Sequence, residues 1–417
     1  MVTTTGPLLT DEMLLRFAER APMYDRENRF FQEDFDELKR AGYLVAPIPT
    51  ELGGLGLSLP TMMQIQRKLG YYAAPTALAL NMHTYWMGAM AGCWDAGDKS
   101  VEPFLRMGAA GEVFAAGHAE SGNDLLTLNS ATRAERVDGG YRIYGKKSFG
   151  SLGPAWTVLG MHAADRSDPA APKIIHAFVP RDRAGMTTSE VWDTLGMRAT
   201  KSDDTVLDGC FASDDEVIRV FPVGAGGIDF WHLSLFAWAL PGFGNIYYGL
   251  AQRAFDITVA AVQKKTSINL TRSMAYHAEV QHQIAEMYLE LEAIGPQLDA
   301  IVNDWANGVD HGHEWGAKLV AAKYNAVEAA WRIVDKGMDL AGGFGIFRTA
   351  GYEQLWRDAR IGRIHPANSS LTHEFIAKTV LGISPDEQPR WGLGATPAAR
   401  WPPAAPGTRS TPATPKD

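Results

Sequence analysis

The 417-residue sequence predicts an α+β chain with three structured parts: an N-terminal α-helical domain, a middle antiparallel β domain and a C-terminal helical bundle. Three observations support this prediction. Helical spacing of apolar residues runs to about residue 110, short β-branched or aromatic runs follow to about 220, and helical stripes return after Gly227. We therefore predict domains at 10–111, 112–222 and 223–383, followed by a disordered Pro/Ala-rich tail at 384–417.

The N-terminal part carries amphipathic helices. In "FFQEDFDELKRAGYL" the apolar residues Phe31, Phe35 and Leu38 recur at three- and four-residue spacing, and Gly42 is placed to end that helix. The following stretch "PIPTELGGLGLSLP" is typical of a glycine-rich loop. Because no βαβ pattern precedes this loop, a dinucleotide site of the Rossmann type is excluded.

The middle part contains a hairpin signal. In "VDGGYRIYG" the residues Asp138, Gly139 and Gly140 can adopt the positive backbone angles that a tight turn requires. Other short runs, such as "VFAAGHA" and "IIHAFVP", have the composition of strands. Residues 112 to about 220 are thus predicted to form a small sheet.

The C-terminal part has long helices with apolar stripes. The stripe in "AEVQHQIAEMYLELEAI" consists of Val280, Ile284, Met287, Leu291 and Ile294. Helices with such stripes pack together as a bundle.

Composition restricts the class of partner. The net charge of -9 and the pI near 5.7 argue against nucleic acid or an anionic membrane, so small molecules or proteins are the expected ligands. Two cysteines far apart, Cys93 and Cys210, suggest neither a disulfide framework nor a thiolate metal site. The N-terminus lacks the pattern of a secretory signal and no run of 18 apolar residues occurs, so we expect a cytoplasmic protein.

No metal site is predicted. In "DHGHEW" the two histidines His311 and His313 stand two apart at the start of an expected helix, where their side chains diverge into solvent. No Ser, His and Asp grouping has the context of a nucleophile elbow either.

Several stretches in the same order resemble the acyl-CoA dehydrogenase superfamily. They are "LKRAGYLVAPIPTELGGLG", "YRIYGKKSF", "GLAQRAFD" and "LAGGFGIFRTAGYEQLWRDARIGRI", and the likeness runs from about 12 to 383. The resemblance implies that family's fold, in which a helical domain, a β domain and a four-helix bundle follow one another. It also implies a flavin cofactor and a homo-oligomer, a dimer or tetramer, because the family builds the flavin pocket from two chains.

The resemblance assigns the residues that contact the flavin ring. An isoalloxazine needs a hydrogen-bonding group near N5, an apolar wall and backbone donors at its carbonyl edge. The strand after the hairpin matches the family's aromatic and hydroxyl positions with Phe149 and Ser151, with Gly150 between them. The loop "GHAESGND" matches the family's backbone contacts, which carries over His118, Ala119, Glu120 and Ser121.

The dinucleotide half is implied by weaker matches. Lys264 stands where relatives hold the FAD pyrophosphate with an Arg, and lysine keeps the charge but loses the bidentate fork. Gly342 and Gly343 begin a retained "GGFG" that permits close backbone approach, whereas Asp339 replaces the family's usual Gln. FAD is the predicted cofactor, with FMN as the alternative.

The family's catalytic base is missing from both of its usual positions. An acyl-CoA dehydrogenase requires a carboxylate beside the substrate α carbon. The loop after "RDAR" places Pro366 at the usual site of that glutamate, and the alternative site on the first bundle helix holds Ala239. Neither side chain ionises, so dehydrogenation by the usual route is not expected.

Three features resemble the family's flavin monooxygenase branch, which includes dibenzothiophene monooxygenase and the nitrososynthases. They are "IHPANS", "WDTLGMRAT" and "NMHTYW". The resemblance gives His365 as the first candidate for proton handling, His83 as the second and His118 as the third, because an imidazole titrates near neutrality. Asn368, Ser369 and Ser370 either contact the flavin or cap the final helix.

The predicted function is a two-component monooxygenase that uses reduced flavin and O2 on a small sulfur-, nitrogen- or carbon-centred substrate. A separate flavin reductase is the implied partner. An acyl-CoA or acyl-carrier-protein dehydrogenase with a relocated base and a catalytically silent flavin-binding protein stay open as alternatives.

Overall fold

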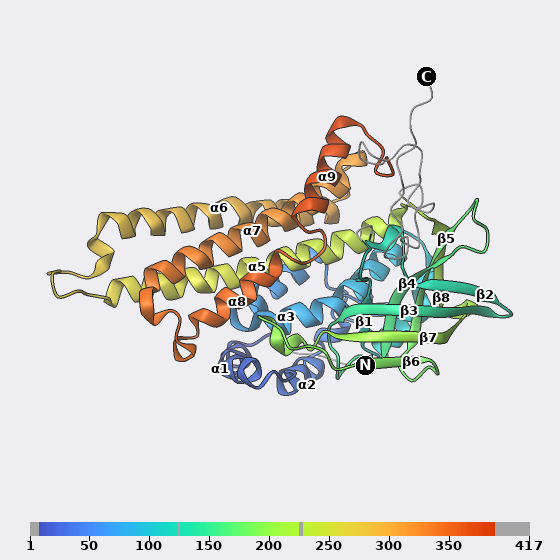
Figure 1. Ribbon diagram of the computed structural model, residues 1–417, viewed down its shortest axis with the longest axis horizontal. Helices are drawn as coiled ribbons and strands as arrows, with labels where there is room; N and C mark the ends of the chain where they lie inside the picture. The colour runs from blue at the N-terminus through green and yellow to red at the C-terminus, as the bar shows by residue number, and fades with distance from the viewer. Residues whose placement is uncertain (1–7, 124–125, 225–227, 388–417) are drawn as a thin grey trace, which may run out of the picture.

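The computed structural model describes residues 8–123, 126–224 and 228–387, and Figure 1 shows their arrangement. Long helices occupy one end of the molecule and the sheet occupies the other (Figure 1). This order confirms the predicted fold class. Most of the predicted disordered tail, from residue 388 onward, lies outside the described residues. In the described part of the chain, no helix is long and apolar enough to cross a membrane.

The N-terminal part consists of four α-helices and short 3-10 turns. The helices are α1 (Asp11–Glu27), α2 (Gln32–Arg40), α3 (Leu59–Asp95) and α4 (Glu102–Ala109). The predicted stop of α2 is confirmed, since Gly42 adopts a φ of 85° directly before the 3-10 turn η1 (Tyr43–Val45). Helix α3 is buried along most of its length and bends near Pro75, where Ala73 has non-helical angles.

The middle part is an eight-stranded sheet. The strands are β1 (Phe114–Gly117), β2 (Arg133–Val137), β3 (Gly140–Gly150), β4 (Val158–Asp165), β5 (Lys173–Pro180), β6 (Met186–Ser189), β7 (Asp203–Ser213) and β8 (Val217–Pro222). Their order is β6-β7-β3-β2-β4-β5-β8, with β1 beside β4. The pairs are antiparallel except that β1 and β2 run parallel to β4, a direction that short apolar runs in a sequence do not encode.

The predicted hairpin is present between β2 and β3. Val137 pairs with Gly140, which leaves Asp138 and Gly139 as the two-residue turn. Gly139 has a φ of 73°, in the region that a tight hairpin turn requires.

The C-terminal part is a bundle built on α5 (Phe230–Lys264), α6 (Ala278–Ala306) and α7 (Trp315–Ala341), which lie side by side in Figure 1. Helices α8 (Tyr352–Gly362) and α9 (Ser369–Leu381) complete it. Helix α5 also packs along α3, and two glycines of α3 allow the close approach. A Cβ on Gly70 would lie 2.6 Å from the carbonyl oxygen of Ile246, and one on Gly88 would overlap the ring of Trp238.

A buried ion pair joins the loop after β1 to the sheet. Glu120 lies on this loop and Lys147 on β3, and each side chain is 1% exposed. The Glu120 carboxylate also accepts hydrogen bonds from the backbone N–H of Ala131 at 2.8 Å and of Thr132 at 3.0 Å, and from the Ser130 hydroxyl at 2.7 Å. Burial alone would raise the pKa of Glu120, but the Lys147 ammonium and these donors hold it below its ordinary value.

Replacing one partner of this pair should be costly. The Glu120→Gln variant leaves the Lys147 ammonium buried without its counter-charge, so we expect the free energy of unfolding to fall by about 3–5 kcal/mol in urea denaturation. The control is Glu286→Gln, which breaks the exposed pair between Glu286 and Lys336 and should change stability little. Equal effects of the two substitutions would contradict this account of the buried pair.

Candidate active site

The end of β3 presents an aromatic ring to solvent. Phe149 is 56% exposed, although large aromatic side chains are usually buried. Its ring lies 5.9 Å from the ring of Trp192 in an edge-on arrangement, so the two side chains form an aromatic corner. This is the position to which the family resemblance assigns the wall beneath the flavin ring. A flat, exposed apolar surface at this position fits that role.

Backbone strain is concentrated around Phe149. Phe149, Leu152, Met197 and Lys201 have φ angles of 60°, 68°, 53° and 43°, and they account for all but one of the non-glycine residues with positive φ in the described chain. The two segments are joined, because the Leu152 N–H donates to the Thr200 carbonyl at 3.1 Å. Strained residues of this kind gather at functional sites.

The Ser151 hydroxyl belongs to a chain of three hydroxyl groups. The Thr200 hydroxyl donates to the Met197 carbonyl at 2.8 Å. The Ser202 hydroxyl lies 2.7 Å from the Thr200 hydroxyl and 2.7 Å from the Ser151 hydroxyl. Each hydroxyl has one proton, so Ser202 must donate to Thr200, and Ser151 must donate to Ser202. Ser151 is therefore left with free lone pairs, which are able to accept a hydrogen bond.

The loop from His118 to Ser121 divides its side chains between two sides. Ala119 pairs with Ser148 of β3, whose N–H donates to the Ala119 carbonyl at 2.9 Å, and Ser121 is exposed. The side chains of His118 and Glu120 instead point inward, His118 toward His162 and His176 and Glu120 toward Lys147. The prediction for this loop concerns backbone contacts to the flavin and stays a prediction, because the inward direction of the His118 and Glu120 side chains leaves the main chain of the loop free to make them.

His365 lies in the loop between α8 and α9, against α5. Its Nε2 is 2.8 Å from the Tyr247 hydroxyl, and its ring stacks on Phe243 at 5.0 Å and 25°. Burial and the nearby Lys323 ammonium lower the pKa of His365 to about 3. The expectation of an imidazole that titrates near neutrality is thus wrong, since this side chain stays neutral at physiological pH.

Direct contacts connect the strained segment to the His365 loop. The Met197 N–H donates to the Asp358 carboxylate on α8, and a Cβ on Gly362, at the end of α8, would lie 2.9 Å from the Tyr247 ring. Asp358 is buried, and burial raises its pKa to about 7. Because this carboxylate accepts a hydrogen bond from the Met197 backbone, its role is to hold the Met197 segment against α8. Pro366, which the resemblance assigns to the family's base position, follows His365 in this loop, and Ala239 on α5 is buried.

His83 has no ring nitrogen left for proton transfer. Its Nε2 is 2.9 Å from the Leu44 carbonyl, and its Nδ1 accepts from the Phe114 N–H at 3.0 Å. Burial lowers the pKa of His83 to about 4, so the ring is neutral with its proton on Nε2. The prediction of a catalytic role for His83 does not fit this geometry. The ring links the N-terminal helices to β1.

The predicted pyrophosphate contacts lie near the end of α5. Lys264 is exposed, while the neighbouring Lys265 Nζ donates to the carbonyls of Leu340 and Ala341, each at 3.3 Å. Gly342 follows with a φ of 64°, and a Cβ on Gly343 would meet only open space. The lysine that reaches the glycine segment is thus Lys265, one position after the predicted one.

Residues 368–370 form the start of α9. The Asn368 side chain accepts from the Leu371 N–H at 3.1 Å, which is an N-cap hydrogen bond. Ser369 and Ser370 are exposed in the first turn. The sequence left open whether these residues contact the flavin or cap the final helix, and the structure contains the helix cap.

Aromatic residues of α3 and of the first turns of α5 divide into two groups. Tyr85, Trp86 and Trp231 are at most 3% exposed and belong to the core. Trp238 instead borders a cavity of about 800 Å³, together with Phe230 and Trp305. His365 does not line this cavity.

Two residues at the site were missed by sequence reasoning. Tyr247 lies on α5 two turns after Ala239, so its spacing could have indicated it. Lys323 interrupts the apolar stripe of α7 between Leu319 and Val327, and a charge on a buried face was a usable signal. Both contact His365, which supports its placement at the centre of the candidate site.

Comparison with known proteins identifies the family. Residues 11–97, 114–210 and 235–381 match the descriptions "Acyl-CoA dehydrogenase, N-terminal domain", "middle domain" and "C-terminal domain", respectively. The three matches follow the order of helices, sheet and bundle and together span most of the chain.

Individual relatives agree with these matches. The putative acyl-CoA dehydrogenase YdbM of Bacillus subtilis is 29% identical, with 87% of this chain and 93% of the relative covered. The L-evernosamine nitrososynthase of a Micromonospora strain is 28% identical, with coverage of 89% and 88%. The structure of KijD3 with FMN and dTDP-3-amino-2,3,6-trideoxy-4-keto-3-methyl-D-glucose has a TM-score of 0.75 at 25% identity, covering 90% of this chain and 93% of that one. This chain therefore belongs to the acyl-CoA dehydrogenase family and is a flavin-dependent oxidoreductase.

Proposed function

We propose that this protein is a two-component monooxygenase, which receives reduced flavin from a separate reductase and uses O2 to oxygenate a small sulfur-, nitrogen- or carbon-centred substrate. The observation that carries the proposal is the composition of the site around Pro366. A neutral His365 bonded to Tyr247 stands beside the position of the family's base, and that position has no ionisable side chain. The similarity to a nitrososynthase makes a nucleotide-linked amino sugar the first substrate to test.

The residues at the end of β3 fit a flavin ring. Phe149 supplies an exposed aromatic surface, and Ser151 supplies a hydroxyl oxygen whose lone pairs are free. A reduced flavin carries a proton on N5, so an acceptor at this position suits the reduced form better than a donor does. When bound, the reduced flavin supplies the two electrons that activate O2. FAD stays the predicted cofactor and FMN the alternative, which mass spectrometry of the bound flavin distinguishes.

Tyr247 and His365 are proposed to hold the proton that the reaction moves. Burial raises the pKa of Tyr247 well above its ordinary value, so the phenol stays protonated and donates to Nε2 of His365. The imidazole proton then resides on Nδ1, where a neutral donor can act without carrying a charge into a buried site.

Lys323 is proposed to position the His365 loop. Its ammonium is 1% exposed and donates to the carbonyls of His365 at 2.8 Å and Ala367 at 3.0 Å. Burial lowers the pKa of Lys323 to about 7, so the group that titrates near neutrality is this lysine.

A homo-oligomer is part of the proposal. Phe344, Ile346 and Phe347 follow the glycine segment after α7 and are 78%, 69% and 58% exposed. An exposed group of large apolar side chains favours a protein interface. A second copy of this chain is the proposed occupant, in line with the family's shared flavin pocket.

Replacing His365 should impair oxygenation. We expect His365→Ala to lower the rate of substrate oxygenation by about 10²-fold or more and to divert O2 to hydrogen peroxide, and Tyr247→Phe to have a smaller effect in the same direction. Both are measured with chemically reduced flavin and O2, using isotope-labelled O2 to identify oxygenated product. His313→Ala, at an exposed position, is the control.

The same preparation tests the alternative. Anaerobic bleaching of the oxidised flavin by an acyl-CoA thioester, or unchanged turnover in His365→Ala, would overturn the monooxygenase proposal. The first result would establish a dehydrogenase with its base elsewhere. Absence of any reaction with flavin bound would point to the silent flavin-binding protein.

Phe149 should contribute to flavin affinity. We expect Phe149→Ala to raise the Kd for flavin by about 10-fold, because an aromatic stacking contact contributes about 1 kcal/mol beyond its buried area. Flavin fluorescence titration measures this change. Tyr288→Ala, which removes a similarly exposed aromatic from α6, should leave the Kd unchanged. An unaltered Kd for Phe149→Ala would place the flavin elsewhere.

The depressed pKa of Lys323 predicts a pH-dependent stability. The pKa is about 7 in the folded protein and about 10.4 in the unfolded chain, so the folded state releases this proton first and the wild type gains stability as pH rises from 7 toward 10. The difference between wild type and Lys323→Met should change by up to about 1.4 kcal/mol per pH unit. Urea denaturation at pH 7, 8 and 9 measures it, with Lys318→Met on the exposed side of α7 as the control. If the free energies of unfolding of wild type and Lys323→Met changed in parallel with pH, the lowered pKa of Lys323 would be refuted.

A further inference from the structure

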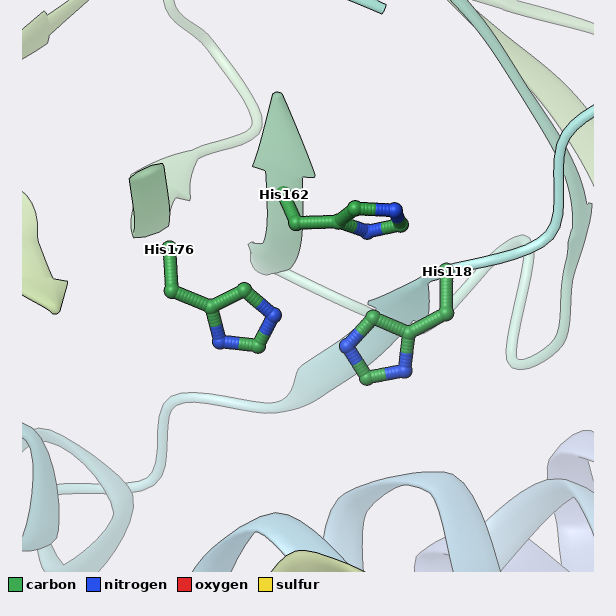
Figure 2. Close-up of side chains that lie close together, drawn as sticks. All are labelled: His118, His162 and His176. Atoms are coloured by element: carbon green, nitrogen blue, oxygen red, sulfur yellow. The ribbon is translucent and has the colours of Figure 1, made fainter. Parts of the chain in front are cut away.

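Three histidines meet on the face of the sheet that packs against α3 and α5, beside the loop after β1. His118 follows β1, His162 lies on β4 and His176 lies on β5. Figure 2 shows the three rings pointing toward one another from these separate segments. One nitrogen of each ring lies within 4.8 Å of the others. The flavin chemistry proposed above makes no use of this cluster.

Each of these rings has a buried nitrogen without a hydrogen-bond partner. The atoms are Nε2 of His118, Nδ1 of His162 and Nε2 of His176. His162 and His176 are 0% and 1% exposed, so water does not satisfy these nitrogens from bulk solvent. Buried polar atoms are nearly always paired, and three unpaired ones that converge on one point indicate a missing ligand.

The protonation of the cluster suits a cation. Burial lowers the pKa of all three imidazoles, to about 3 for His118 and well below the ordinary value for the other two, so the rings are neutral. Nε2 of His162 lies 3.0 Å from the Asn129 carbonyl and must carry the proton, which leaves a lone pair on Nδ1. Histidines that bind metals commonly donate their second N–H to a backbone carbonyl in this way.

The surroundings are closed and nearly neutral. The ring of Trp86 lies 4.9 Å from the His118 ring, and the ring of Trp231 lies 5.9 Å from the His176 ring, so aromatic side chains surround the cluster. The Lys147 ammonium opposes a cation here, but the paired Glu120 carboxylate offsets it, with Oε2 at 3.8 Å from Nε2 of His162. Neutral imidazoles with this balance favour a borderline transition metal over Ca²⁺ or Mg²⁺.

We propose that His118, His162 and His176 bind one Zn²⁺ ion between the sheet and helices α3 and α5. Three imidazole nitrogens supply three of the four ligands that zinc prefers, and the fourth position is available to water or another small ligand. Such an ion would join the loop after β1 to β4 and β5 and thereby stabilise the sheet that carries the flavin edge. The site was not predicted from the sequence, which indicated no metal.

Metal content tests the proposal directly. The full-length protein with its flavin is incubated with Zn²⁺, passed through a desalting column and analysed for metal by mass spectrometry. We expect about one zinc per chain. His176→Phe keeps an aromatic ring among Trp86, Phe221 and Trp231 but removes the ligand, and should lower zinc retention at least about 10-fold. His313→Asn, which alters an exposed histidine, should retain the wild-type zinc content.

A second measurement uses only the wild-type chain, so it tests the zinc site even if the His176→Phe variant does not fold. Co²⁺ is added as a spectroscopic probe to protein freed of zinc, and X-ray absorption identifies the ligand atoms. Imidazole nitrogens around a four-coordinate ion are expected. A folded wild-type chain that retains neither Zn²⁺ nor Co²⁺, or zinc content that persists in folded His176→Phe, would overturn the proposal.

Discussion

The buried pair between Glu120 and Lys147 fixes the geometry on which both functional regions depend. It holds the loop after β1 against β3 with almost no exposure of either charge. Buried charges are tolerated only when paired and fully hydrogen-bonded, and Glu120 meets this condition through the backbone donors of Ala131 and Thr132. The loop therefore has one register against the sheet, and that register decides which side chains face inward and which face outward.

Alternation along this loop lets one segment serve two purposes. Ala119 pairs with Ser148, two residues before the end of β3 where Phe149 and Ser151 form the proposed flavin edge. His118 faces the opposite side and joins His162 and His176. Because successive residues of an extended segment point to opposite faces, a cofactor edge and an interior cluster can share one backbone. The positive-φ residues Phe149, Leu152, Met197 and Lys201 gather around this edge, where the flavin is proposed to bind.

The sequence predicted those features that local patterns encode. The turn at Asp138–Gly139, the stop at Gly42 and the helical stripes all depend on nearby residues. Family resemblance added Phe149 and His365, which the structure places at an exposed aromatic corner and in a loop packed against α5. It could not give the pKa of His365 or the inward direction of Glu120, because burial and long-range pairing set both. The histidine cluster could not be predicted from the sequence either, because its members come from three segments that meet only in the folded protein.

His83 has a consequence for how the N-terminal helices and the sheet can move relative to each other. Its ring bonds the loop at Leu44 and the start of β1 at Phe114 simultaneously, so the N-terminal helices and the sheet are fastened together from within. Separation along that seam would strand both ring nitrogens in an apolar interior. The His365 loop is held in another way, through the Lys323 ammonium on its carbonyls and through the bond of its own ring to Tyr247. The two imidazoles thus fasten the two ends of the molecule separately, one between the N-terminal helices and the sheet and one within the bundle.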